Sequence, residues 1–117
     1  MSNPAQNLIS ELRRGTLVLS VLSQLGEQQY GYSLKERLDG RGIEIDQGTL
    51  YPLLRRLEEQ DLLESEWSVE GPRPRRYYKL SDIGKQTLHT LIEEWRALTQ
   101  AMDQLLTKWE ETTDEMD

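Results

Sequence analysis

Residues 46–58 read DQGTLYPLLRRLE, the most informative stretch of the chain for predicting the fold. At about 100° per residue, its leucines gather on one face, as they do in an amphipathic helix that packs on a core. The inner face consists of Leu50, Leu53, Leu54 and Leu57. Asp46 precedes the first turn and is of a type favoured at the N-cap. Because Pro52 lacks a backbone donor, we expect the helix to begin near Gly48, with the proline in or just beyond its first turn.

Two helices are expected before this stretch. Residues 5–25 repeat apolar side chains at three- and four-residue spacing in a wide arc, which predicts a helix buried on more than one side. Gly26 is well placed to end it. Residues 32–38 predict a second, short helix, and residues 39–42 have the composition of a turn. The alternation at residues 43–45 predicts a short strand.

A β-hairpin is expected after residues 46–58. Its first strand has Leu63, Trp67 and Val69 on one face, and its second strand contains Tyr78 and Leu80. Glycine and prolines between the two strands indicate a turn. The tip and the second strand carry a run of basic residues without a neighbouring acid in the sequence, namely Arg73, Arg75, Arg76 and Lys79.

The longest helical pattern begins after Ser81, which suits the N-cap, with Asp82 in the first turn. Two apolar series that each repeat every seven residues define the a and d positions of three heptads. The a series is Leu88, Trp95, Met102 and Trp109, and the d series is Leu91, Leu98 and Leu105. This stripe predicts a homodimer joined through Leu88, Leu91, Trp95, Leu98, Met102 and Leu105. The acidic tail at residues 110–117 is expected to be frayed.

The element order predicts a mainly α protein with a small β-wing, a winged helix-turn-helix with an added N-terminal helix and a long C-terminal helix. We expect residues 1–80 to form the DNA-binding domain and residues 81–117 the dimerisation helix. Hydrophobic residues are only 36% of the 117, and a chain this small and polar often gains core by self-association.

The net charge of −7 is unevenly distributed. Residues 81–117 contain nine acidic and three basic residues, whereas residues 31–80 nearly balance nine basic with ten acidic ones. Binding to DNA depends on the local patch more than on the total charge. The charge still leaves one alternative open, a winged helix for protein contacts whose acidic last helix is the docking surface.

The sequence offers little for catalysis. It has no cysteine and one histidine, His89, at an expected solvent-facing position, with no phosphate-binding loop and no metal-ligand cluster. We therefore expect no enzyme, no metal site and no cofactor. No apolar run approaches the ~20 residues that cross a membrane. The first residues also lack the pattern of a signal peptide, which favours a cytoplasmic protein.

In a winged helix, the helix at residues 46–58 enters the major groove and the wing lies along the backbone or minor groove. Arginine suits guanine or phosphate, and Tyr and Thr hydroxyls more often bond phosphates. The candidate DNA contacts are Lys35, Gln47, Thr49, Tyr51, Arg55, Arg56, Arg73, Arg75 and Arg76. Alternatives remain: Arg55 or Arg56 pairs with Glu58 or Glu59, Tyr51 packs at the core edge, and Lys35 is simply solvated.

Three stretches occur in order that together resemble the PadR family of transcriptional regulators. They are Tyr-Gly-Tyr at residues 30–32, GTLYPLLRRLE at residues 48–58 and RRYYKLSDIG at residues 75–84. With the flanking helices, the resemblance covers nearly the whole chain. It implies a homodimeric repressor of a palindromic double-stranded DNA operator, whose C-terminal helix packs on the partner, often on its N-terminal helix.

The single C-terminal helix is similar to that of the small subfamily containing multidrug-sensing regulators. The resemblance implies that a tryptophan of this helix stacks on planar aromatic molecules at the dimer interface and so releases the repressor. Trp95 stands at the matching position, and an indole offers a wide apolar face for such ligands. The alternative is that Trp95 is plain dimer core.

Overall fold

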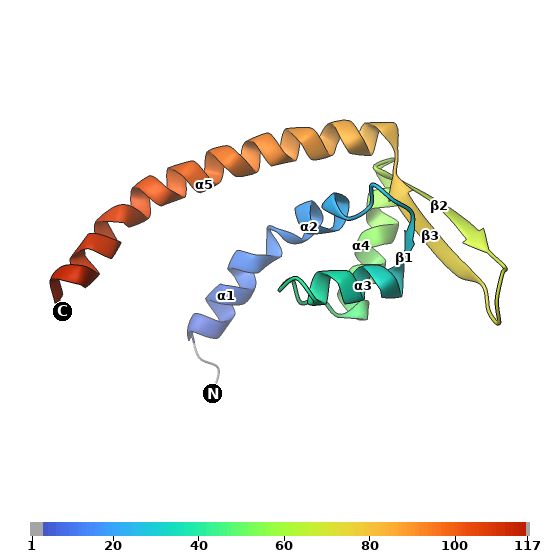
Figure 1. The fold of residues 1–117 in the computed structure, drawn as a ribbon, viewed down its shortest axis with the longest axis horizontal. Helices are drawn as coiled ribbons and strands as arrows, with labels where there is room; N and C mark the ends of the chain where they lie inside the picture. Colours follow the sequence, from blue (N-terminus) through green and yellow to red (C-terminus); the bar gives the residue numbers. More distant parts are fainter. Residues whose placement is uncertain (1–3, 117) are drawn as a thin grey trace.

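The computed structural model describes residues 4–116, and for residues 111–116 the backbone alone (Figure 1). Five helices and a three-stranded sheet form a winged helix, which confirms the expected fold class. The elements, in order, are α1 (Pro4–Arg14), α2 (Leu17–Ser23), β1 (Gln29–Tyr30), α3 (Gly31–Asp39), α4 (Gln47–Glu59), β2 (Leu63–Ser68), β3 (Arg75–Leu80) and α5 (Asp82–Met116).

The core forms where α2, α3 and α4 meet the base of the wing. The four leucines expected on the inner face of α4 are all buried, and Leu50 is fully enclosed. They pack with Val21 and Leu22 of α2 and with the base of the hairpin at Leu63 and Leu80. Burying a leucine stabilises a fold by about 1.5–3 kcal/mol, so these side chains fix α4 against the domain.

Helix α4 begins one residue earlier than expected. The Asp46 carboxylate accepts a hydrogen bond from the Thr49 amide at 2.8 Å, which confirms the N-cap. Because the helix starts at Gln47, Pro52 lies in its second turn, where it cannot donate to the Gly48 carbonyl. Pro52 is exposed, so its ring lies on the outer side of the helix.

The single helix expected over residues 5–25 is two helices. Helix α1 ends at Arg14, and the Thr16 amide and hydroxyl both donate to the Arg13 carbonyl, at 3.0 and 2.7 Å, closing a tight turn. Glycine at position 15 lowers helix propensity at this point. The expected burial holds for α2 but not for α1, which has no buried residue. The expected stop at Gly26 is also wrong, because α2 ends at Ser23.

The sheet has the order β1-β3-β2 and is antiparallel. In the hairpin, Leu63 pairs with Leu80 and Ser68 pairs with Arg75. The strand expected at residues 43–45 is a loop, in which the buried Ile45 donates its amide to the Asp39 carboxylate at 3.2 Å. The third strand is instead β1, which pairs with the middle of β3 at Tyr77 and Tyr78.

Helix α5 starts at a tight junction with the domain. The Ser81 hydroxyl accepts from the Gly84 amide at 2.9 Å and donates to the Asp61 carbonyl at 2.6 Å, which confirms Ser81 as the N-cap. A Cβ atom on Gly84 would lie 2.0 Å from the Leu62 carbonyl oxygen, so only glycine fits. The helix then leaves the domain and continues to Met116, where a frayed tail was expected.

Candidate nucleic-acid interface

An open cleft of about 710 Å³ lies between the start of α3, the outer side of α4 and the wing. Its aromatic lining consists of Tyr30, Tyr32, Tyr51, Trp67 and Tyr78. Its cationic lining consists of Arg55, Arg73, Arg75 and Arg76, and Gln47 adds an amide. No carboxylate lines this cleft, so the surface is locally positive in a chain of net charge −7. Guanidinium groups beside aromatic faces suit phosphates and bases.

The α4 residues expected to contact DNA differ in their surroundings. Gln47 and Arg55 line the cleft and are exposed, and Arg56 is exposed outside it. Tyr51 is half-buried and packs on the core, and a Cβ atom on Gly31 would lie 2.4 Å from its ring. The Tyr51 ring therefore packs at the edge of the core, as the alternative interpretation predicted. The same ring also forms a wall of the cleft.

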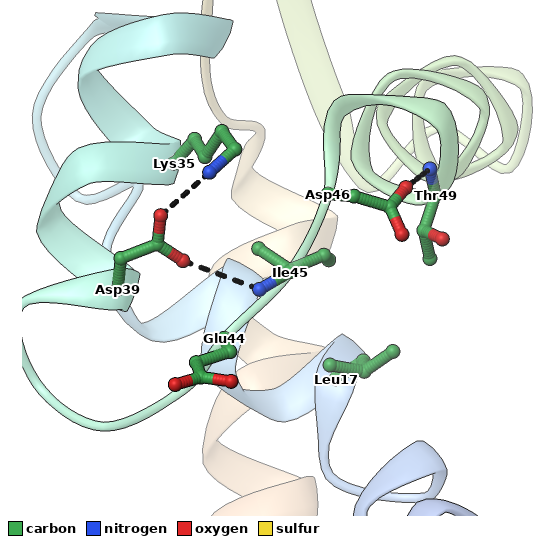
Figure 2. Close-up of a pocket in the computed structure, with 7 residues that line it drawn as sticks. All are labelled: Leu17, Lys35, Asp39, Glu44, Ile45, Asp46 and Thr49. Atoms are coloured by element: carbon green, nitrogen blue, oxygen red, sulfur yellow. Dashed lines mark hydrogen bonds and ion pairs between the residues drawn. The ribbon is translucent and has the colours of Figure 1, made fainter.

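Lys35 and Thr49 line a different depression, beside the loop that connects α3 to α4 (Figure 2). The Lys35 ammonium pairs with the Asp39 carboxylate at 2.6 Å, and Asp39 also accepts from the Ile45 amide. The hydrogen bond from Lys35 lowers the pKa of Asp39, and the same bond raises the pKa of Lys35. Lys35 is therefore not a simple solvated lysine, and it lies outside the cleft. Its pair with Asp39 braces the loop before α4.

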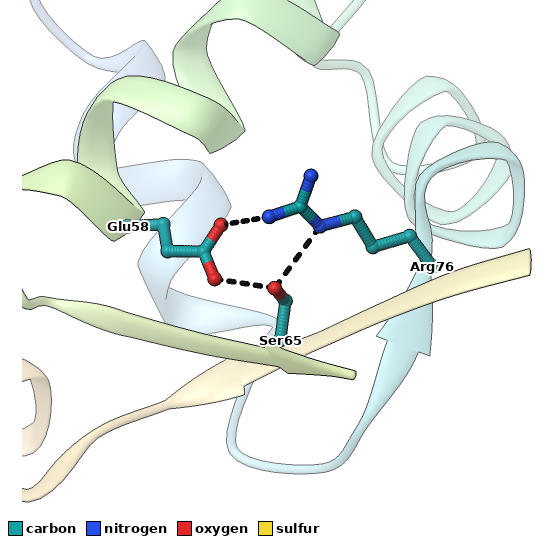
Figure 3. Close-up of polar contacts among 3 residues, drawn as sticks. All are labelled: Glu58, Ser65 and Arg76. Atoms are coloured by element: carbon teal, nitrogen blue, oxygen red, sulfur yellow. Dashed lines mark hydrogen bonds and ion pairs between the residues drawn. The ribbon is translucent and has the colours of Figure 1, made fainter. Parts of the chain in front are cut away.

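The three wing arginines have different environments. Arg73 and Arg75 are exposed, and the Arg75 guanidinium lies over the Tyr30 ring at 4.6 Å from its centre. Arg76 is half-buried and donates to Glu58 of α4 at 2.5 Å and to the Ser65 hydroxyl at 3.0 Å (Figure 3). Arg76 has no acidic neighbour in the sequence, but the fold brings α4 against the wing and so places Glu58 beside it.

Most of the aromatic lining was not predicted from the sequence. Trp67 lies on the strand face that the alternation marks as apolar, yet the residue is 64% exposed and borders the cleft. Tyr30 stacks edge-to-face on Tyr77 with 5.6 Å between ring centres, and Tyr32 is exposed at the mouth. A hydrogen bond with Glu36 raises the pKa of Tyr32. The only available signal was the Tyr-Gly-Tyr stretch.

The helices that extend beyond the domain carry exposed apolar side chains. Leu8, Ile9 and Leu12 are exposed on α1. The outer turns of α5 expose Trp95, Leu98, Met102, Leu105 and Leu106. Figure 1 shows α1 and the C-terminal part of α5 extending from the domain on the same side. Exposed apolar patches of this kind mark surfaces for protein partners or ligands.

Leu88 and Leu91 differ from the rest of the expected dimerisation stripe. Both are half-buried and pack against the core of their own chain, beside the base of the domain. At these two heptad positions, the leucine side chains therefore pack within their own chain. The expectation of a dimer depends on the stripe from Trp95 onward.

The part of the chain that the structure describes contains neither a candidate membrane span nor a candidate metal-binding cluster. None of the helices in that part combines the length and the hydropathy that a membrane span requires. No three His, Asp or Glu side chains in that part are grouped so that they could hold a metal ion.

Comparisons with known proteins agree on one family. A model of the PadR-like family of transcriptional regulators matches residues 18–90. The crystal structure of a PadR family transcriptional regulator from Eggerthella lenta is 48% identical, with a TM-score of 0.83 over 87% of this chain and 91% of that one. A PadR-like regulator from Bacillus cereus is 30% identical, with a TM-score of 0.74 over 82% and 96% of the two chains. A transcriptional regulator of Mycobacterium tuberculosis is 34% identical over 97 residues, which are 82% of this chain and 88% of the relative.

Proposed function

The chain belongs to the PadR-like family of transcriptional regulators, and we propose that it is a homodimeric repressor of a palindromic DNA operator. The observation that carries the proposal is the cleft of about 710 Å³, whose lining includes arginines from both α4 and the wing and no carboxylate. A duplex that approaches this face meets cations from two elements at once.

In the proposed complex, α4 enters the major groove and the wing follows the adjacent backbone. Gln47 and Arg55 suit base edges, since Gln pairs with adenine and Arg with guanine. Arg73 and Arg75 suit phosphates or the minor groove, being exposed at the wing. Arg56 and Thr49 are further candidates at the two ends of the exposed face of α4.

The proposed dimer joins the exposed stripe of α5 to the partner subunit. Leu98, Met102 and Leu105 expose roughly half or more of their side chains, which a second helix would remove from water. The apolar side of α1 offers a second surface to the same partner. In this arrangement residues 1–80 read DNA and residues 81–117 join the subunits, so a twofold axis would match a palindromic site.

Trp95 is the proposed ligand contact. Its indole is 40% exposed on the outer part of α5, next to the stripe proposed to join the subunits. A gap between two facing copies would form a flat apolar slot for a planar aromatic molecule. Quenching of tryptophan fluorescence by such compounds, lost in Trp95→Ala, supports this site, and unchanged quenching in the variant excludes it.

Selection of bound fragments from the source genome tests the proposed function as a whole. The expected result is enrichment of a duplex with inverted repeats, bound with an affinity that falls steeply as salt rises. Failure to enrich any fragment would contradict DNA binding and would favour a winged helix that contacts proteins.

A further inference from the structure

A closed polar network joins α4 to both strands of the wing. Arg76 on β3 donates through Nη2 to the Glu58 carboxylate at 2.5 Å and through Nε to the Ser65 hydroxyl at 3.0 Å. The Ser65 hydroxyl on β2 donates in turn to the other oxygen of Glu58. Figure 3 shows these three side chains meeting between the helix and the sheet.

The surroundings of Arg76 are those of a structural arginine. Its guanidinium lies 5.4 Å from the centre of the Tyr78 ring and 5.8 Å from that of Trp67. The edge formed by Nε and Nη2, which suits bidentate contact with a phosphate or guanine, is already occupied by Ser65 and Glu58. Because Glu58 also neutralises the charge, the pair adds little to the positive potential of the cleft.

The backbone gives the outer wing limited support. Strand β1 pairs with Tyr77 and Tyr78 of β3 and does not reach Arg76 or Arg75. From Trp67 and Arg76 outward, the hairpin is a two-stranded ribbon, and such ribbons are marginally stable alone. Its direction relative to α4 therefore depends on side-chain contacts, and the Glu58–Arg76 pair links these two elements directly.

We propose that Glu58 and Arg76 are positioning residues, which hold the wing at a fixed angle to α4 and do not themselves contact DNA. This inference rests on the proposed function, because both elements must reach one duplex together. A wing that is already oriented binds without the cost of being ordered in the complex. A wing that can move relative to α4 keeps its charged side chains, but these side chains are no longer held at fixed positions relative to that helix.

The proposal predicts an effect of opposite sign to that of simple electrostatics. Removing the Glu58 carboxylate deletes a negative charge beside a DNA-binding face, which alone would strengthen binding. The lost brace weakens binding instead. Glu59→Ala is the matched control, because it deletes the same charge one residue later from an exposed position on α4. Alanine favours helix at both positions, so α4 itself is preserved.

The experiment titrates the full-length chain into the duplex selected from the source genome, at several salt concentrations. Glu58→Ala is expected to bind at least about fivefold more weakly, as for the loss of a charged hydrogen bond. The slope of log affinity against log salt should stay that of the wild type. Glu59→Ala should bind as tightly as the wild type or more tightly. Thermal unfolding of each variant shows that it is folded at the temperature of the titration.

Arg76→Lys provides a second test that keeps the positive charge. Lysine binds phosphate well but cannot reproduce the two-sided contact with Glu58 and Ser65, so we expect weaker binding with an unchanged salt slope. Wild-type affinity in Arg76→Lys or in Glu58→Ala would overturn the positioning role of these residues but not the proposed function. So would a slope smaller by about 0.9 in Arg76→Gln, the change expected for a lost phosphate contact. A wild-type chain that bound no selected duplex would overturn the proposed function as well.

Discussion

Replacing Gly84 by alanine puts a methyl group where the junction between the domain and α5 has no room for one. The added Cβ would lie 2.0 Å from the Leu62 carbonyl oxygen, which belongs to the backbone and cannot rotate away. Carbon and oxygen atoms approach to about 3.3 Å at the closest. The start of α5 or the Leu62 peptide must therefore move by about 1.3 Å.

That movement disturbs hydrogen bonds that share the junction. The Ser81 amide donates to the same Leu62 carbonyl at 3.1 Å, and the Gly84 amide donates to the Ser81 hydroxyl at 2.9 Å. Each bond stabilises the fold by about 1 kcal/mol, and overpacking alone costs about 1–3 kcal/mol. Alanine recovers up to about 1 kcal/mol of helix propensity. We expect a net loss of about 2–4 kcal/mol in the free energy of unfolding, which lowers Tm by roughly 10 °C or more.

Thermal unfolding followed by far-UV circular dichroism measures this effect, at equal protomer concentrations because association changes Tm. Gly26→Ala is the matched control, since a Cβ there meets no atom within 4 Å and the backbone does not need a positive φ. Its expected change is within about 1 kcal/mol of zero. A Gly84→Ala variant that unfolds within a few degrees of the wild type would show that the junction has room for the added methyl group.

Three further predictions concern other parts of the chain. Asp46→Ala removes the N-cap of α4 and should lower the free energy of unfolding by about 1 kcal/mol in urea; an unchanged value would contradict the cap. The hydrogen bond from Lys35 lowers the pKa of Asp39 in the fold. This pair therefore stabilises the protein at any pH above the ordinary aspartate pKa of about 3.9, and its contribution is lost as the pH falls through the folded pKa. Urea unfolding at neutral and acid pH should therefore show a smaller pH dependence in Asp39→Asn, and equal dependence would exclude the pair as its source. Leu98→Asp should shift sedimentation toward the monomer while Ala97→Asp, one residue away, should not; a Leu98→Asp dimer as stable as the wild type would contradict the interface.

The periodic parts of the sequence predicted the fold well. The leucines of residues 46–58 recur at helical spacing and share a single face of the helix. This pattern predicted both α4 and the face that it buries in the core. Ser81 and Asp82 ahead of a long apolar repeat likewise predicted the start of α5. These are local patterns, in which neighbouring residues already contain the information about structure.

The errors lie where the structure depends on partners distant in the sequence. Strand β1 exists because Gln29 and Tyr30 pair with Tyr78 and Tyr77, and two residues show no alternation to recognise. Arg76 was expected to meet DNA because its acid, Glu58, is 18 residues away and meets it only when the wing packs on α4. The break between α1 and α2 had only Gly15 as a signal, which alone lowers helix propensity modestly.

The assignment of the α4–wing cleft as the DNA-binding surface is tested most directly by operator affinity in Arg55→Ala. The control is Arg96→Ala, which removes the same exposed cation from α5, outside the cleft. Fluorescence anisotropy at fixed salt should show Arg55→Ala binding the selected duplex roughly tenfold to a hundredfold more weakly, and Arg96→Ala binding like the wild type. Equal affinities for all three proteins, or equal losses in both variants, would contradict the assignment of the cleft as the DNA-binding surface.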